Sequence, residues 1–227
     1  MLSIVPHKSR YAKGLLLSAL IVVAATGAFV ASVSADHQPA NKMAVSASGI
    51  EFLRNTTAPA ANEGPRVILE GALKTSKPTD LVFQVTLECS LWTALAVVGN
   101  DAPSQATGRV KVWVTFDSPD PAAGVVGLGP TDTRDPGKIV FCDRTHGMTM
   151  SGFDDDEDDH RVDTFLKTRT ANAFNWILIN AGSGVHTVRV WAELDVSVDE
   201  GQGFVEAGVG KRTLVIEPVM LPNDAKL

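Results

Sequence analysis

Six consecutive acidic residues, Asp154 to Asp159, form the densest group of titratable side chains in this 227-residue chain. Adjacent carboxylates repel one another, and a hard cation relieves that repulsion by taking several carboxylate oxygens as ligands. If calcium binds here, the alternate acids Asp154, Asp156 and Asp158 are the predicted ligands. The EF-hand spacing is missing because no glycine stands at the sixth position, so a solvated acidic loop is the simpler interpretation.

Two histidines, His146 and His160, flank this acidic run. His160 and Asp163 would form an acid–base or metal cluster if the chain folded them together, so a metal-dependent hydrolase using residues 154–163 is the alternative function. The chain contains no H-E-x-x-H, no G-x-S-x-G and no phosphate-binding glycine loop. We therefore expect a non-catalytic protein with no cofactor other than, at most, calcium.

Two similar octets place a tryptophan in the same position of an alternating pattern. They are V-K-V-W-V-T-F-D, from Val110 to Asp117, and V-R-V-W-A-E-L-D, from Val188 to Asp195. In each octet the valines share one side of the predicted strand, and the tryptophan lies on the other, polar side.

These tryptophans, Trp113 and Trp191, have Lys111 and Arg189 two residues before them. Exposed rings in this setting would form a platform for sugar rings or for a partner protein. The alternative is that the rings are covered by lysine and arginine stems, or by the loop at 124–137.

The same alternation organises most of the chain. From Ser183 to Val198 the even positions are mostly apolar and the odd positions mostly polar, which predicts a strand with one buried face and puts His186 in the core. Similar patterns and the turn residues between them predict nine short strands. They lie at 45–53, 66–74, 80–91, 110–117, 138–142, 162–167, 172–180, 183–198 and 211–220.

Two of these strands carry further expectations. The strand at 172–180 has apolar residues on both sides, which predicts cover on both faces. The strand at 211–220 contains Pro218, which indicates an edge position or the end of pairing. Nine strands without a helical pattern predict an antiparallel β-sandwich, with residues 36–227 as a single domain.

The segment G-V-H-T-V-R-V, from Gly184 to Val190, resembles the penultimate strand of immunoglobulin-like domains in exported bacterial and archaeal proteins. The resemblance extends over about 35 residues, through Met220. It implies an immunoglobulin-like sandwich in which this strand forms a hairpin with the last one, and it implies no activity.

Both cysteines are expected to face the core. Cys89 belongs to the apolar row of the strand at 80–91, and Cys142 shares its side of a strand with Val140. A disulfide between them would close a loop of roughly 54 residues and stabilise the fold by about 4 kcal/mol. Two free buried thiols are the alternative.

Residues 1–35 have the pattern of an export signal, in which three basic residues precede an uncharged run from Gly14 to Ser34. We expect cleavage before Asp36, and an uncleaved membrane-anchoring helix is the alternative. Cleavage would change the formal charge from −6 to −9, because it removes three positive charges and no acids. Such an acidic chain is a poor partner for nucleic acid or for an anionic membrane.

We therefore expect a secreted or extracytoplasmic protein that acts by binding or by surface assembly. Its predicted partner is a protein or carbohydrate at the cell surface, or a second copy joined through an edge strand such as 211–220. Asn55 lies in an N-x-T pattern and would be glycosylated only in a host that modifies exported proteins.

Overall fold

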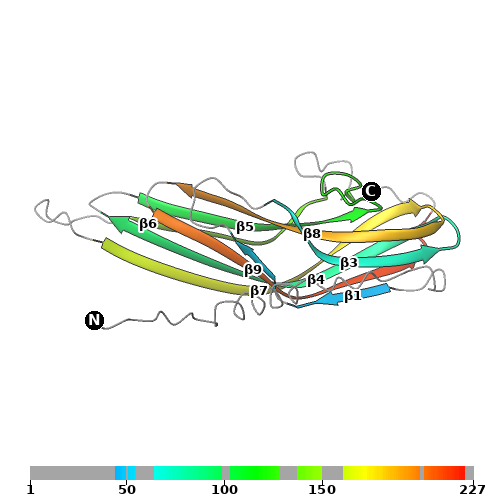
Figure 1. The fold of residues 1–227 in the computed structure, drawn as a ribbon, viewed down its shortest axis with the longest axis horizontal. Helices are drawn as coiled ribbons and strands as arrows, with labels where there is room; N and C mark the ends of the chain where they lie inside the picture. The colour runs from blue at the N-terminus through cyan, green and yellow to red at the C-terminus, as the bar shows by residue number, and fades with distance from the viewer. Residues whose placement is uncertain are drawn as a thin grey trace, which may run out of the picture. The chain divides into compact units, whose positions relative to one another are not determined.

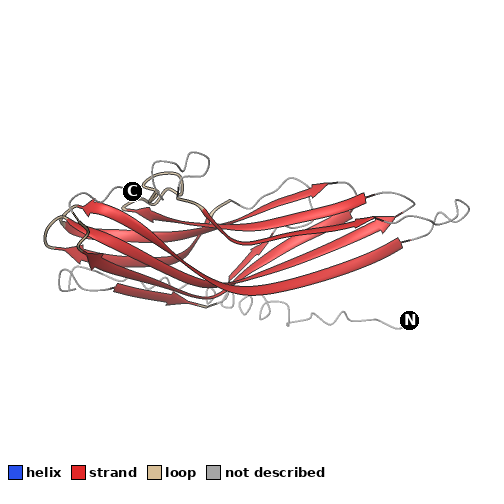
Figure 2. Ribbon diagram, turned by 180° about the vertical axis from the view of Figure 1, so that it is seen from behind, coloured by secondary structure: helices blue, strands red, loops and turns tan. Residues whose placement is uncertain are grey.

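The computed structural model describes residues 44–49, 51–54, 64–98, 103–127, 137–149, 161–199 and 202–222. All regular structure among these residues is β-strand (Figure 2). The predicted all-β antiparallel sandwich is confirmed for this part of the chain. Residues 1–35 lie outside it, and the described residues include no helix long and apolar enough to cross a membrane.

Nine strands are defined, and most are longer than their sequence patterns predicted. They are β1 (Ala44–Ser48), β2 (Glu51–Arg54), β3 (Arg66–Thr75), β4 (Thr79–Val98), β5 (Pro103–Phe116), β6 (Ile139–Thr149), β7 (Arg161–Ala181), β8 (Gly184–Asp199) and β9 (Gln202–Val219).

The strands form two antiparallel sheets that lie one over the other (Figure 1). Sheet A has the order β1, β9, β4 and β7, and β2 continues the edge that β1 begins, because both pair with β9. Sheet B has the order β3, β8, β5 and β6. The edge strands of the described sandwich are therefore β1 with β2, and β7, in sheet A, and β3 and β6 in sheet B.

The pairing is nested along the chain. The first strands pair in reverse order with the last: β1 and β2 with β9, β3 with β8, β4 with β7, and β5 with β6. The nested pairs together form one long hairpin, and this hairpin is folded over on itself, because β4 also pairs with β9 and β5 also pairs with β8. As a result, consecutive strands from β2 onward change sheets, except for β5 and β6.

Two predictions about the last strand are wrong. The strands β8 and β9 do not form a hairpin, because they belong to different sheets. The strand β9 is not an edge strand either, because it lies between β4 and the edge formed by β1 and β2. Pro218 lies beyond Ile216, where the pairing with β1 stops, and it is still paired with Leu81 of β4. At this end β9 has a partner on one side alone among the described strands, which is the local edge position that a proline indicates.

The predicted strands at 162–167 and 172–180 are one continuous strand, β7, of 21 residues. The prediction that 172–180 is covered on both faces is wrong. Trp176 faces the core and is fully buried, but Asn175 and Ile179 on the other face are exposed. The strand is an edge strand with one solvent face, so apolar residues on both sides did not signify two covering layers.

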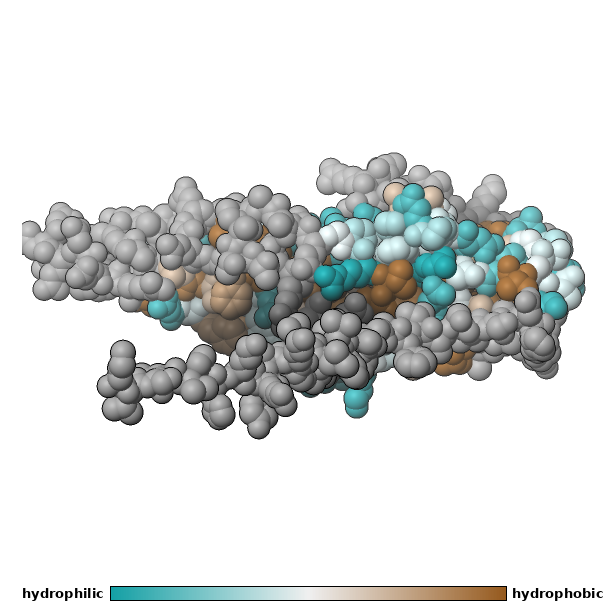
Figure 3. Space-filling model, in the orientation of Figure 1, coloured by the Kyte–Doolittle hydropathy of each residue, from teal (hydrophilic) through white to brown (hydrophobic). Residues whose placement is uncertain are grey.

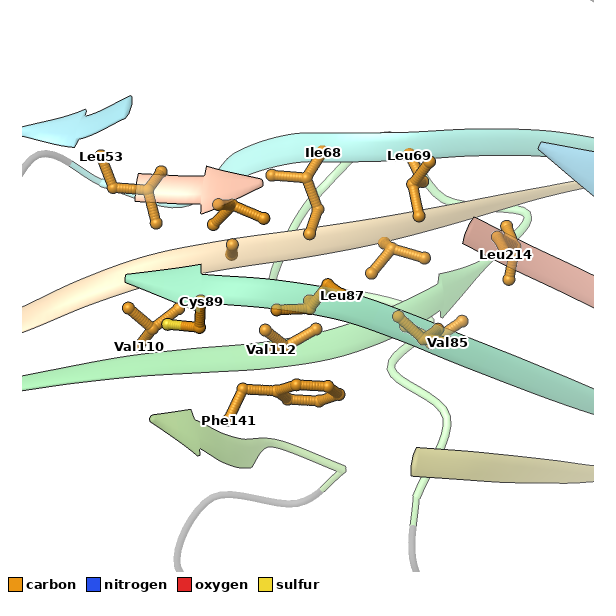
Figure 4. Close-up of a cluster of buried hydrophobic side chains, with 14 of the residues drawn as sticks. Leu53, Ile68, Leu69, Val85, Leu87, Cys89, Val110, Val112, Phe141 and Leu214 are labelled. Carbon is orange, nitrogen blue, oxygen red and sulfur yellow. The ribbon is translucent and has the colours of Figure 1, made fainter. Parts of the chain in front are cut away.

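The core lies between the sheets and follows the predicted alternation. In β4, the odd positions from Leu81 to Leu95 are buried, and the even positions lie on the outer face with partial or full exposure. Figure 4 shows how side chains from both sheets meet; its labelled residues include Val85, Leu87, Cys89 and Leu214 of sheet A, and Ile68, Leu69, Val110, Val112 and Phe141 of sheet B.

A disulfide joins the two sheets. Cys89 on β4 is bonded to Cys142 on β6, and their Cα atoms lie 6.3 Å apart. The predicted pairing is confirmed, and neither cysteine is a free thiol. The bond links an inner strand of sheet A to an edge strand of sheet B, and so fixes the separation of the sheets beside β7.

His186 is a buried structural residue, as the alternation predicted. Its Nδ1 atom lies 2.7 Å from Asp117 Oδ2, and its Nε2 atom lies 3.0 Å from Thr75 Oγ1 and 2.8 Å from the carbonyl oxygen of Gly182. These contacts join the ends of β3 and β5 to the start of β8.

Candidate binding surface

The predicted tryptophan platform is covered. Trp113 and Trp191 lie directly opposite each other on β5 and β8, on the outer face of sheet B. Trp113 has no exposed surface and Trp191 has 7%. The chain after β5 folds back over them: Val126 donates a backbone hydrogen bond to Val114, and Trp113 Nε1 donates to the carbonyl oxygen of Pro121 at 2.8 Å.

The sequence left loop cover open as an alternative to an exposed platform, and the structure shows this cover. It comes from the segment just after β5, residues 117–127, of which only the last four lie in the predicted 124–137 loop. With this cover in place, no more than 7% of either tryptophan is exposed.

The two basic residues near the tryptophans form ion pairs on the same outer face of sheet B. Lys111 lies 3.4 Å from Asp195, and Arg189 lies 2.8 Å from Glu70. Arg189 also donates to the carbonyl oxygen of Ser118 at 3.0 Å. Because of these ion pairs and the covering segment, the outer face of sheet B presents charged side chains here, and the two tryptophan rings lie beneath them.

The predicted calcium ligands Asp154, Asp156 and Asp158 lie outside the described residues, as do Asn55 and His160. Within the described ranges, no group of three or more histidine, cysteine, aspartate or glutamate side chains is placed to hold a metal ion.

His146 lies on β6 and points between the sheets. Its Nδ1 atom is 3.5 Å from Thr93 Oγ1, and its Nε2 atom is 3.3 Å from Thr164 Oγ1. Burial, and then the positive charge of Arg144, lower the pKa of His146 from its ordinary value of 6.5. The neutral ring bridging two hydroxyls is a structural arrangement within the sandwich.

The edge strand β7 gathers exposed apolar side chains. Val162 is 38% exposed, Phe165 59%, Leu166 42% and Ile179 36%. Among the described strands, β7 pairs with β4 alone, so the backbone along its other side has no strand partner. A long apolar edge strand of this kind is a template for pairing with another chain.

An aromatic surface continues from β7 onto its neighbours. Phe165 of β7 and Phe204 of β9 both lie opposite Ala94 of β4, so the three residues form one row across the outer face of sheet A. Phe204 is 37% exposed. Trp92 is partly exposed two positions before Ala94, and the ammonium of Lys167 lies 5.0 Å from the centre of its ring.

We call the free edge of β7 together with Phe165, Trp92 and Phe204 the β7 surface. Single exposed apolar residues are ordinary on proteins. On the described part of the face in Figure 3, apolar residues stand in small separate groups among hydrophilic ones. The β7 surface differs because exposed apolar side chains coincide with an unpaired strand edge.

A charged pair limits this surface on the side of Arg169. Arg169 of β7 is hydrogen-bonded to Glu88 of β4, and this bond is the main cause that lowers the pKa of Glu88. Small residues, Ala171 and Ala173, follow on the same face of β7.

The sequence pattern does not reveal the β7 surface, for three separate reasons. Trp92 lies in an apolar stretch with no clear period, Phe165 lies in the short predicted strand at 162–167, and Phe204 lies among glycines before the predicted strand at 211–220. Only the pairing of β7, β4 and β9 brings them together.

No protein-family model matches this chain, and no curated protein matches it either.

Proposed function

We propose that this chain is an exported, non-catalytic protein of a surface assembly, and that it joins a second copy of itself through β7. The observation that carries the proposal is the 21-residue edge strand with four exposed large apolar side chains. The Cys89–Cys142 disulfide supports an oxidising compartment, in agreement with the export signal expected at residues 1–35.

We further infer that the sandwich is a jelly roll rather than an immunoglobulin-like domain. Nested pairing of the two halves of the chain, folded over into two sheets, is the jelly-roll arrangement. Immunoglobulin domains pair strands as ABED and CFG. Jelly rolls occur in binding and shell-forming proteins, but that likeness supports a fold and not an activity.

An antiparallel pair of β7 strands centred on Ala171 suits the sequence of this edge. In that register Phe165 lies opposite Ile177 of the second copy, and Arg169 lies opposite Ala173. The other charged residues of β7 also meet uncharged ones, so no like charges face each other across the new pair. The product is a continuous sheet through both copies, with two-fold symmetry, which is the commonest symmetry of homo-oligomers.

The substitution Phe165→Glu tests this proposal. We expect the mature wild-type domain to dimerise at high concentration in size-exclusion chromatography with light scattering, and F165E to remain a monomer. Because Phe165 is 59% exposed, F165E should change the free energy of unfolding by no more than about 0.5 kcal/mol. The matched control is Val45→Glu, at a 60% exposed residue on the opposite edge of the same sheet, which should leave dimerisation unchanged.

A cysteine substitution tests the register. Ala171→Cys should form a disulfide between two copies under mild oxidation, because residue 171 faces itself across the symmetry axis. The control Ala173→Cys lies opposite residue 169 and should form little. A wild-type domain that stays monomeric at high concentration would show that β7 does not pair with itself.

A further inference from the structure

Two buried polar atoms of the described residues have no hydrogen-bond partner: Nη1 of Arg144 and Oγ1 of Thr168. Leaving a buried donor unsatisfied is costly, and the cost is greater when the group is charged. Buried polar groups in proteins are nearly always paired, so two such atoms need an explanation.

Both residues point into the space between the sheets. On β6, Cys142 is bonded to Cys89 and His146 contacts Thr93, and Arg144 lies midway between them on the same side of the strand. On β4, the residue midway between Cys89 and Thr93 is Leu91, and its partner on β7 is Thr168. The register therefore brings Arg144 and Thr168 into the same layer of the sandwich.

Contacts on either side fix this alignment of β6 with β7. Asn172 of β7 donates a hydrogen bond to the carbonyl oxygen of Phe141, and Thr164 of β7 contacts His146. Arg144 lies between these contacts on β6, and Thr168 lies between them on β7.

Among the described residues, Nη1 of the positively charged Arg144 has no acceptor. The nearest acid along β6, Asp143, points to the outer face and is paired with Arg109 at 3.2 Å. The lowered pKa of His146 leaves that ring neutral near pH 7. Its two nitrogen atoms already contact threonine hydroxyls, so His146 does not satisfy Arg144.

We propose that Arg144 and Thr168 bind a small monovalent anion of the carboxylate class between the sheets. The N–H of Arg144 Nη1 and the hydroxyl of Thr168 both donate to its oxygens, and its single negative charge neutralises the guanidinium. The anion must be small because Leu91 is buried on one side and Gly108, which pairs with Arg144, is buried on the other. This site is independent of the pairing proposed for β7.

Thermal unfolding of the mature domain in formate tests the proposal. Sodium formate is titrated against sodium gluconate at constant ionic strength, since gluconate carries the same carboxylate on a body too large for the site. We expect a saturable rise in Tm of about 3–6 °C when formate stands at ten times its dissociation constant.

Three variants assign the effect to the site. Arg144→Met keeps the apolar stem, and should abolish the response to formate while melting in gluconate at or above the wild-type temperature, because it removes a buried donor that has no hydrogen-bond partner. Thr168→Val keeps the shape of the side chain and should weaken formate binding by about tenfold. Arg109→Met, at an exposed arginine on the outer face of the same sheet, should leave the response unchanged.

A single buried water between Arg144 and Thr168 is the competing explanation, and it predicts equal melting in formate and gluconate. That result in the wild-type domain would overturn the proposal. A formate response that persists in T168V at full strength, and in R144M if that variant folds, would overturn it as well.

Discussion

Trp113 and Trp191 face each other across β5 and β8, and both are buried although they lie on the outer side of their sheet. The segment after β5 covers them, and the ammonium of Lys138 lies 4.6 Å from the centre of the Trp113 ring. The pair forms a small second core on sheet B, and its role is structural.

Removing either ring should therefore destabilise the domain. We expect Trp113→Ala to lower the free energy of unfolding by about 3–5 kcal/mol, the usual loss for a buried tryptophan. Trp113→Phe should lose less, since it keeps most of the packing but not the hydrogen bond to Pro121. Urea unfolding measures both; an alanine variant as stable as the wild type would contradict the burial argument.

The disulfide should contribute to stability mainly by restricting the unfolded chain. Replacing both Cys89 and Cys142 with alanine is expected to lower the free energy of unfolding by about 4 kcal/mol, the chain-entropy value for a loop of roughly 54 residues. Reduction of the wild type with dithiothreitol should give a similar loss. If the reduced and oxidised domains unfold at the same urea concentration, the bond is not a stabilising link.

Gly108 marks a point where the two sheets touch closely. A Cβ atom added at Gly108 of β5 would lie 2.4 Å from Cγ1 of Val205 on β9. We expect Gly108→Ala to destabilise the domain by about 1–3 kcal/mol through overpacking. Because the clash involves one side chain, adding Val205→Ala should recover part of that loss, giving non-additive effects in a double-mutant cycle.

Gly147→Ala is the matched control for this clash. Gly147 is an exposed glycine within β6, and an added Cβ there would meet no atom closer than 4.0 Å. That variant should be neutral or slightly stabilising. Equal losses at Gly108 and Gly147 would argue against a specific contact between the sheets.

His146 should make the domain less stable in acid. Its pKa is lowered in the folded state, so below about pH 6.5 the unfolded chain binds a proton that the folded chain does not. This contribution to stability is lost as the pH falls from the unfolded pKa to the folded pKa, and below both it changes no further.

His146→Gln, which can still bond to hydroxyls, lacks this titration. Urea unfolding across about pH 7.5 to 5 should show the wild type losing stability relative to H146Q as the pH falls. Carboxylates titrate in both proteins and cancel in the difference. A difference that does not change with pH would show that His146 is free to protonate in the folded domain.

The local pattern of the chain predicted the places of most strands and most of their inward rows. The buried odd positions of β4, the inward Cys89 and the buried His186 all follow from alternation with a period of two residues. That period depends only on backbone geometry, so it can be read directly from the order of residues.

The same alternation does not indicate which strands flank a given strand, or which segment covers its outer face. It placed Trp113 and Trp191 on the outer face correctly, yet their cover comes from a separate segment of chain. It also could not show that β9 would be an inner strand, because pairing joins residues far apart in sequence.

The sequence by itself thus determined that this protein is a β-sandwich, and which side of most strands faces the core. The tertiary structure decided the order of strands in each sheet, the exposure of Phe165 beside the free edge of β7, and the alignment of Arg144 with Thr168. Alternation is a local property of one strand, whereas edges, cover and unsatisfied groups arise only when distant strands pack together.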